Sequence, residues 1–120
     1  MKQESVILKN VTKGVTVGTR VMVADTCLRR LVGLLGRTEL DTGCGLLIKP
    51  SSGVHTYGML FAIDVVAFDK KMRVMKLWRK LGPFRLTGID LKIDSIVELP
   101  VETIDGCRIE LGDRFEIGRE

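Results

Sequence analysis

The chain has 120 residues, of which 45% are hydrophobic and 28% are charged, and its formal net charge is +4. These values are typical of one globular domain, here residues 1–120, and they exclude a disordered or fibrous chain. No apolar run approaches the ~20 residues needed to span a bilayer, and the first residues lack the pattern of a secretory signal. We therefore expect a cytoplasmic protein without a transmembrane segment.

Two strands and a helix are predicted in the first third of the chain. Residues 5–10 and 19–26 contain β-branched residues in partial alternation, and a glycine-containing turn separates them. Leu28, Leu31 and Leu35 then follow helical spacing, and a glycine stands where helices often end. We therefore expect one short amphipathic helix over about 26–35.

The middle of the chain is predicted to contain a short strand and then a β-hairpin. Residues 46–49 are apolar enough to form a buried strand, which ends at Pro50. Residues 63–78 contain two strand-like runs that are joined by the turn sequence "DKKM". Beyond the hairpin, a glycine followed by a proline predicts irregular structure over residues 79–88.

The last third of the chain is predicted to add two more strands. Residues 95–100 form one strand, a single helical turn follows Pro100, and residues 111–118 contain a glycine turn and a final strand. Short strands at close spacing around one helix favour an α+β, β-rich fold. We expect a compact, mostly antiparallel barrel or sandwich.

The cysteines do not form a metal-binding pattern. Cys27, Cys44 and Cys107 are widely spaced, no CxxC pair occurs, and His55 is the only histidine that could complete a zinc site. We therefore expect free thiols, no metal site and no cofactor.

A basic stretch follows the turn of the predicted hairpin. Seven lysines and arginines occur from Lys70 to Arg85, together with Trp78 and Phe84. Basic residues beside aromatic residues suit single-stranded nucleic acid or an acidic membrane surface, but lysine and arginine on a hairpin also prevent edge-to-edge pairing of sheets. The last 28 residues are acidic, so the two regions could also complement each other within one fold. The candidate basic patch comprises Lys70, Lys71, Arg73, Lys76, Arg79 and Lys80.

His55 could act as a general base in a hydrolase or transferase. Ser51 and Ser52 are candidate nucleophiles, and Asp64 is a candidate for the group that would orient the imidazole. The chain has no GxSxG motif, and a lone histidine in an apolar stretch is more often a hydrogen-bonded structural group. Catalysis therefore remains an alternative hypothesis.

Asp64 precedes "VVAF", so its strand is predicted to be buried. A buried carboxylate needs an ionic partner or main-chain N–H donors. Arg37, Arg85 and Arg114 are candidate ionic partners of Asp64.

Several motifs together resemble one known family. "RRLVGLLGR", "GCGLLIKP", "VHTYGMLFAIDVVAFD", "LGPFR", "IVELP" and "LGDRFEI" occur in this order, and their arrangement is similar to the domain of unknown function 192 family, also called uncharacterised protein family 0127. The resemblance covers about residues 21–117, and it is close to a branch with a His-Thr motif. It implies a small β-rich barrel with an accessory helix, in a family without an established biochemical role.

The chain departs from the family pattern at several positions. Ser51 stands where this branch commonly has cysteine, Met72 replaces the turn glycine of the hairpin, and Glu102 replaces a small residue after "ELP". Leu60 and Ala62 replace a usual arginine and proline, so a basic group beside the His-Thr motif is missing. The resemblance therefore implies that ligand preference differs from that of other members.

We expect a non-catalytic binding or accessory module with a small polar pocket. Such a pocket suits a small polar ligand or a protein partner that is held by a few directed hydrogen bonds. A hydrolase with His55 as general base, or a nucleic-acid binder that uses the basic patch, remain alternatives. The candidate pocket residues are His55, Thr56, Asp64, Arg85, Arg37 and Glu98.

Overall fold

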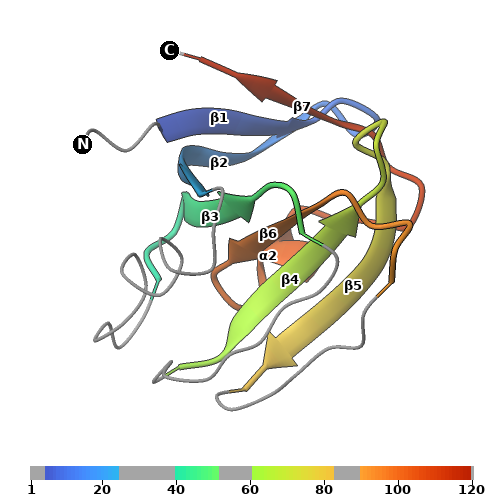
Figure 1. The fold of residues 1–120 in the computed structure, drawn as a ribbon. Coiled ribbons are helices and arrows are strands. Elements are labelled where there is room, and N and C mark those ends of the chain that lie inside the picture. Colours follow the sequence, from blue (N-terminus) through green and yellow to red (C-terminus); the bar gives the residue numbers. More distant parts are fainter. Residues whose placement is uncertain (1–4, 25–39, 52–60, 83–89, 120) are drawn as a thin grey trace.

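The computed structural model describes residues 5–24, 40–51, 61–82 and 90–119, which form seven strands and one short helix (Figure 1). The elements are β1 (Ser5–Asn10), β2 (Val15–Ala24), β3 (Cys44–Ile48), β4 (Ile63–Phe68), β5 (Val74–Leu81), β6 (Ser95–Leu99), α2 (Thr103–Gly106) and β7 (Phe115–Gly118). Among the described residues, no helix is long and apolar enough to cross a membrane.

The strands form one curled sheet in the order β5-β4-β6-β3-β2-β1-β7. Neighbouring strands are antiparallel except for β2 and β3, which are parallel. The two edge strands approach each other at one end, where Arg73 and Arg114 form an isolated β-bridge. The sheet is therefore a half-barrel that is partly closed at one end, which confirms the predicted β-rich, mostly antiparallel fold.

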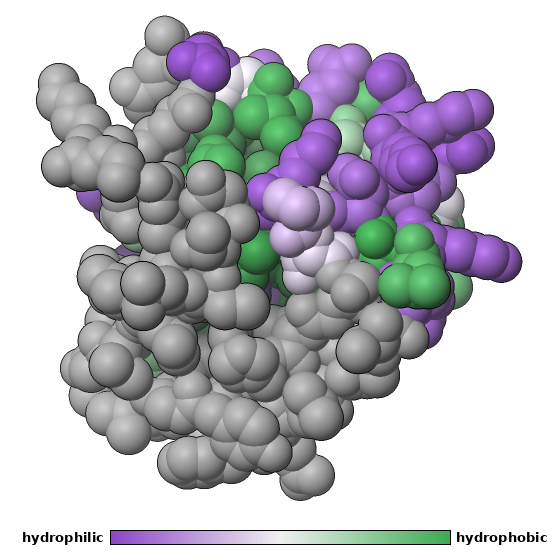
Figure 2. Space-filling view, in the orientation of Figure 1, coloured by the Kyte–Doolittle hydropathy of each residue, from purple (hydrophilic) through white to green (hydrophobic). Residues whose placement is uncertain are grey.

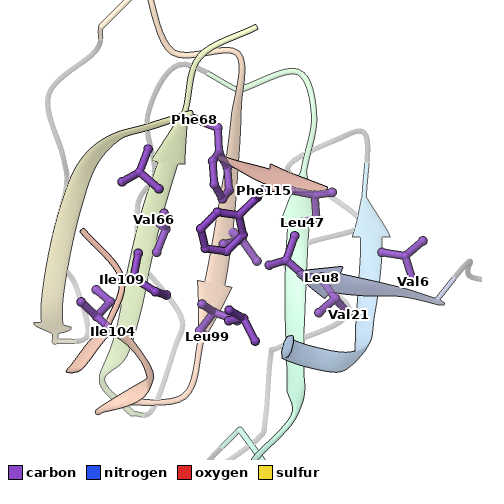
Figure 3. Close-up of a cluster of buried hydrophobic side chains, with 13 residues drawn as sticks. Val6, Leu8, Val21, Leu47, Val66, Phe68, Leu99, Ile104, Ile109 and Phe115 are labelled. Atoms are coloured by element: carbon purple, nitrogen blue, oxygen red, sulfur yellow. The ribbon is translucent and has the colours of Figure 1, made fainter. Parts of the chain in front are cut away.

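Both faces of the central strands are buried, which explains their continuous apolar sequences. Every residue of β4 and β6 is buried, so alternate side chains along each strand enter two different hydrophobic clusters. The inner core lies inside the curl and contains Val66, Phe68 and Leu99 (Figure 3). The outer core lies on the opposite face and contains Val65 and Ile96.

Two phenylalanines and the helical turn fill the inner core. The rings of Phe68 and Phe115 lie 5.0 Å apart at 58°, a tilted geometry that aromatic pairs favour (Figure 3). Ile104 from α2 and Ile109 from the segment that follows it are both at most 2% exposed. The acidic last third of the chain therefore contributes core residues as well as surface charge.

Most strand predictions are confirmed, and the errors occur at a bulge and at glycines. β3 begins at Cys44, two residues before the strand predicted over 46–49. β1, β6, the β4–β5 hairpin, the helical turn and the last strand lie where they were expected. The predicted turn over 11–18 was too long, because Gly18 lies inside β2, opposite Leu8. Residues 79–81 belong to β5 rather than to an irregular segment. The predicted helix over 26–35 lies outside the described residues.

Two departures from the family pattern fall on residues with unusual backbone geometry. Met72 has a φ of 58° and Glu102 a φ of 73°, values at which glycine is the least strained residue. The Met72 side chain compensates in part, because it packs against the inner core and its sulfur accepts a hydrogen bond from Ser95 Oγ at 3.6 Å. Glu102 is exposed, and its side chain makes no capping hydrogen bond to α2.

Candidate functional site

The structure describes two of the six predicted pocket residues. Asp64 lies on β4 and Glu98 lies on β6, whereas His55, Thr56, Arg85 and Arg37 lie outside the described residues. The ligand-binding roles of all six therefore stay predictions, and the surroundings of the two carboxylates can be examined directly.

Asp64 uses its carboxylate to join three parts of the fold. The side chain is 1% exposed. Its Oδ1 accepts a hydrogen bond from the main-chain N–H of Lys80 at 3.0 Å, and its Oδ2 accepts one from the N–H of Ile104 at 2.9 Å. The first bond holds a bulged part of β5, since Lys80 has a φ of 51° and the β4–β5 register shifts nearby. The second bond satisfies an N–H in the first turn of α2, which has no partner within the helix.

Main-chain donors were one of the two expected solutions for this buried carboxylate. The other expected solution was an arginine partner. For Arg114 this prediction was wrong, because its guanidinium pairs with Glu116, with Nη2 at 3.4 Å from Oε1. Arg37 and Arg85 lie outside the described residues. Charged hydrogen bonds to main-chain N–H groups compensate for part of the cost of burying the carboxylate.

Glu98 and Asp64 lie on opposite faces of the sheet. In the antiparallel β4–β6 pair, Asp64 is opposite Leu99 and Val65 is opposite Glu98. Directly opposed residues share a face, so Asp64 lies on the face of the inner core and Glu98 on that of the outer core. Glu98 is 0% exposed and has an interaction partner of its own. The structure therefore does not bring the two carboxylates together in one pocket.

A small polar pocket lies where β3 ends. It has a volume of about 300 Å³ and is lined by Pro50, Ser51, Ile93 and Asp94. The N–H of Ser51 donates to the main-chain oxygen of Asp94 at 3.0 Å, and Lys49 Nζ lies 3.6 Å from Asp94 Oδ2. In the sequence, the segment with the His-Thr motif begins directly after Ser51.

A buried polar cluster at Asp113 was absent from the sequence-based list of site residues. Asp113 is 5% exposed, and its Oδ2 accepts hydrogen bonds from Asn10 Nδ2 at 2.8 Å, from Lys13 Nζ at 2.9 Å and from the N–H of Glu110 at 3.0 Å. Burial raises the pKa of Asp113, but these hydrogen bonds outweigh that effect and hold its pKa below the usual value. Hydrogen bonds to Glu110 and Asp113 raise the pKa of Lys13. The "LGD" motif could have pointed to this cluster, because its aspartate is Asp113 and belongs to the family pattern.

The six residues of the basic patch are all exposed. Figure 2 shows hydrophilic surface gathered at the end of the molecule that carries the β4–β5 turn in Figure 1. Half of the patch residues pair with carboxylates of the same chain, which reduces the charge available to an external anion. The pairs are Arg73–Asp69 at 3.3 Å, Lys76–Asp90 at 3.2 Å and Arg79–Asp105 at 2.9 Å.

Within the described ranges, the cysteines do not form a metal site, and Cys107 is not an activated nucleophile. Cys44 and Cys107 are free thiols, and burial raises the pKa of Cys107, which disfavours the reactive thiolate. The described residues contain no group of three or more histidine, cysteine, aspartate or glutamate side chains that could hold a metal ion. Cys27 lies outside them.

Comparisons with known proteins agree with the fold and identify the family. The DUF192 family model, described as "Uncharacterized ACR, COG1430", matches residues 8–117. A UPF0127 protein of Thermococcus sibiricus is 31% identical over 115 residues, which cover 92% of this chain and 73% of that protein. A UPF0127 protein of Pyrococcus furiosus is 33% identical over 113 residues, which cover 92% of this chain and 97% of that protein.

Among solved structures, a protein of unknown function from Novosphingobium aromaticivorans has the same fold. Its TM-score is 0.77 at 20% identity, over 95% of this chain and 84% of that one. The placement in the branch with the His-Thr motif stays a prediction. The family model and the two relatives nevertheless cover most of the chain, which therefore belongs to the DUF192 (UPF0127) family.

Proposed function

We propose that this protein is a non-catalytic binding module that holds a small polar ligand or the end of a partner segment where β3 ends. The proposed site combines the pocket beside Ser51 and Asp94 with His55, Thr56, Arg85 and Arg37. The two arginines would favour an anionic group on the ligand, because guanidinium binds carboxylate and phosphate with paired hydrogen bonds.

The state of Asp64 is the observation that carries this proposal. Both of its carboxylate oxygens accept main-chain hydrogen bonds inside the sheet, and the side chain is 1% exposed. A carboxylate that orients a catalytic imidazole must direct an oxygen toward that ring. The geometry of Asp64 therefore favours a supporting role in the fold over a role in a Ser-His-Asp arrangement.

The pocket at the end of β3 supports the position of the proposed site. Its lining includes a hydroxyl, a carboxylate and two apolar residues, Pro50 and Ile93. Small-molecule sites commonly combine apolar walls with a few polar groups that fix orientation. Because His55 and Thr56 follow Ser51 within five residues, the chain can bring them to the same end of the sheet. In the β4–β6 pair, Asp64 is opposite Leu99 and Phe68 is opposite Ser95, so Asp64 and Glu98 lie toward the other end of β6 from Asp94 and outside this pocket.

The nucleic-acid alternative is less favoured by the charges. Three of the six basic-patch residues are already paired with aspartates. Binding of an oligonucleotide that weakens steeply with added salt and is lost when the patch is reversed in charge would restore this alternative.

The cytoplasmic location and the single domain over residues 1–120 that we expect from the sequence stay predictions.

A nuclear magnetic resonance titration tests the proposal. Diglycine, succinate and inorganic phosphate are suitable probes, because each is small and polar and carries a carboxylate or phosphate group. We expect at least one of them to shift the amide signals of Ser51 and Asp94 in a saturable manner. The same protein, assayed with a panel of activated esters and a fluorophosphonate label, should show neither turnover nor labelling. Turnover that depends on His55 would contradict the proposal and favour the hydrolase alternative.

A further inference from the structure

Among the strands that the structure describes, none pairs with the outer edge of β5. β5 is the first strand in the sheet order and pairs only with β4. At its beginning, the N–H of Val74 donates to Asp113 O at 2.8 Å and its carbonyl accepts from the N–H of Gly112 at 2.9 Å, so the segment before β7 covers this part of the edge. From Met75 to Leu81, the residues that the structure describes provide neither a further strand nor a main-chain hydrogen bond to the outer edge of β5, so within this part of the fold the edge can accept an added strand.

An open groove accompanies this uncovered edge. Its volume is about 500 Å³, and it is lined by Met75, Lys76, Leu77, Trp78, Arg79 and Leu111. Leu111 is 65% exposed, and Leu77 and Trp78 are half-buried. Apolar side chains thus flank the open main-chain edge, which distinguishes it from an edge that is only protected by charge.

Over residues 76–79, each face of β5 presents one apolar and one basic residue to a neighbour. Lys76 and Trp78 are opposite Ala67 and Val65, so both lie on the face of the outer core. Leu77 is opposite Val66 and lies on the face of the inner core, where alternation also places Arg79. Residues 76–79 of β5 are thus basic, apolar, apolar and basic in this order. A strand added beside them would match this order with acidic, apolar, apolar and acidic residues.

The existing ion pairs of this edge are exchangeable. Lys76 pairs with Asp90 at 3.2 Å and Arg79 with Asp105 at 2.9 Å. The four side chains range from 25% to 71% exposed, and ion pairs at such positions are weak. Carboxylates of an incoming strand would replace the two aspartates without a net gain in ion pairs, so the charges would contribute to specificity and the main chain to affinity.

A second copy of this chain is a poor occupant of the groove. Antiparallel pairing of two β5 edges would bring Lys76 and Arg79 of both copies into one interface, and the juxtaposition of like charges disfavours such an interface. The charges thus favour a different partner, with acidic residues.

We propose that the β5 edge binds an extended acidic segment of a partner protein, which adds to the sheet as an eighth strand and carries the pattern acidic, apolar, apolar, acidic. Main-chain hydrogen bonds would supply affinity, and the alternating side chains would supply specificity. This site is separate from the pocket beside Ser51, so either proposal can fail without the other.

Fluorescence polarisation with a labelled peptide that contains Thr-Glu-Val-Val-Glu-Thr tests the proposal. We expect saturable binding that weakens with added salt, and a peptide with lysine in place of both glutamates should bind much more weakly. In two further peptides, the first or the second valine is N-methylated. Because only alternate N–H groups of an added strand face its neighbour, one of these peptides should lose binding and the other should keep it.

The double variant Lys76→Glu/Arg79→Glu should bind the acidic peptide about tenfold more weakly and the lysine peptide more tightly than the wild type. The matched control Lys70→Glu/Lys71→Glu has the same change in charge at the β4–β5 turn and should change affinity by less than about threefold. Leu111→Ser, at an exposed position, should weaken binding without a change in the melting temperature.

The proposal is overturned if the acidic peptide does not bind at about 1 mM, because even a weak specific contact is detectable there. Equal loss in the charge variant and its matched control, or full binding by both N-methylated peptides, would also contradict strand addition. A dimer that dissociates in Lys76→Glu/Arg79→Glu would assign the edge to a second copy instead.

Discussion

Replacement of Asp64 by asparagine tests the structural role of this carboxylate. The substitution keeps the size and shape of the side chain but leaves one acceptor oxygen where the native residue has two. One of the two N–H donors, from Lys80 or Ile104, would then face an amide NH₂ group at a site that is 1% exposed. Either the bulged part of β5 or the first turn of α2 would lose its anchor.

The expected loss in unfolding free energy is about 2–4 kcal/mol. A hydrogen bond to a charged group contributes about 1.5–3 kcal/mol, and a buried N–H without an acceptor costs about 1–3 kcal/mol, so the two effects overlap in part. Domains of this size are stable by about 5–15 kcal/mol, so the variant should fold. Its melting temperature should fall by roughly 10 °C.

This loss can be measured by urea denaturation, with the fluorescence of Trp78 as the signal. The slope of the unfolding free energy against urea concentration should be the same in the variant and the wild type, as expected if both unfold in two states. Hydrogen exchange should show faster exchange of the N–H of Lys80 or Ile104. The control is Asp105→Asn, which makes the same chemical change on α2 at a side chain that is 71% exposed, and it should cost less than about 0.5 kcal/mol. A loss for Asp64→Asn no larger than that of the control would refute the argument.

Two further predictions concern other parts of the described chain. The pKa of Asp113 is held below its usual value in the folded protein, so its stabilising contribution is present above about pH 4 and is lost as the pH falls through the folded pKa. Asp113→Asn should therefore be less stable than the wild type near neutral pH, and acid titrations should show the difference narrowing below about pH 4; a constant difference would argue against this linkage. Glu102→Gly should raise stability by about 0.5–1 kcal/mol in chemical denaturation, because the strain at a φ of 73° exceeds the entropy cost of glycine. A decrease would show that the backbone at this position is not strained.

The sequence predicted the strands that are apolar runs bounded by turn residues. β6 and the β4–β5 hairpin are examples, since their residues are buried on one or both faces and turn residues bound them. The end of β5 was missed because a bulge with a left-handed residue, Lys80, interrupts the alternation. The start of β2 was missed because glycine is common in turns. Gly18 instead lies inside the strand, where a Cβ atom would lie 2.7 Å from Val21 Cγ2 and only glycine fits without a shift.

The pairing of distant residues could not be predicted from local patterns. The parallel β2–β3 pair joins strands whose connection spans residues 25–43. The opposite faces of Asp64 and Glu98 follow from the register between β4 and β6, which depends on the whole sheet. Sequence reasoning required donors for Asp64, but it could not choose among a main-chain N–H and several arginines. The family resemblance was specific because it rested on the order of several motifs, and the family match confirms it.

The most direct test of the proposed binding function is to measure affinity and stability together in His55→Ala. For whichever of diglycine, succinate and phosphate binds the wild type, we predict a dissociation constant at least about tenfold higher in the variant, while its melting temperature stays within about 3 °C of the wild type. Unchanged affinity, or an unfolded variant, would contradict the proposal that His55 contacts a ligand at a preformed site.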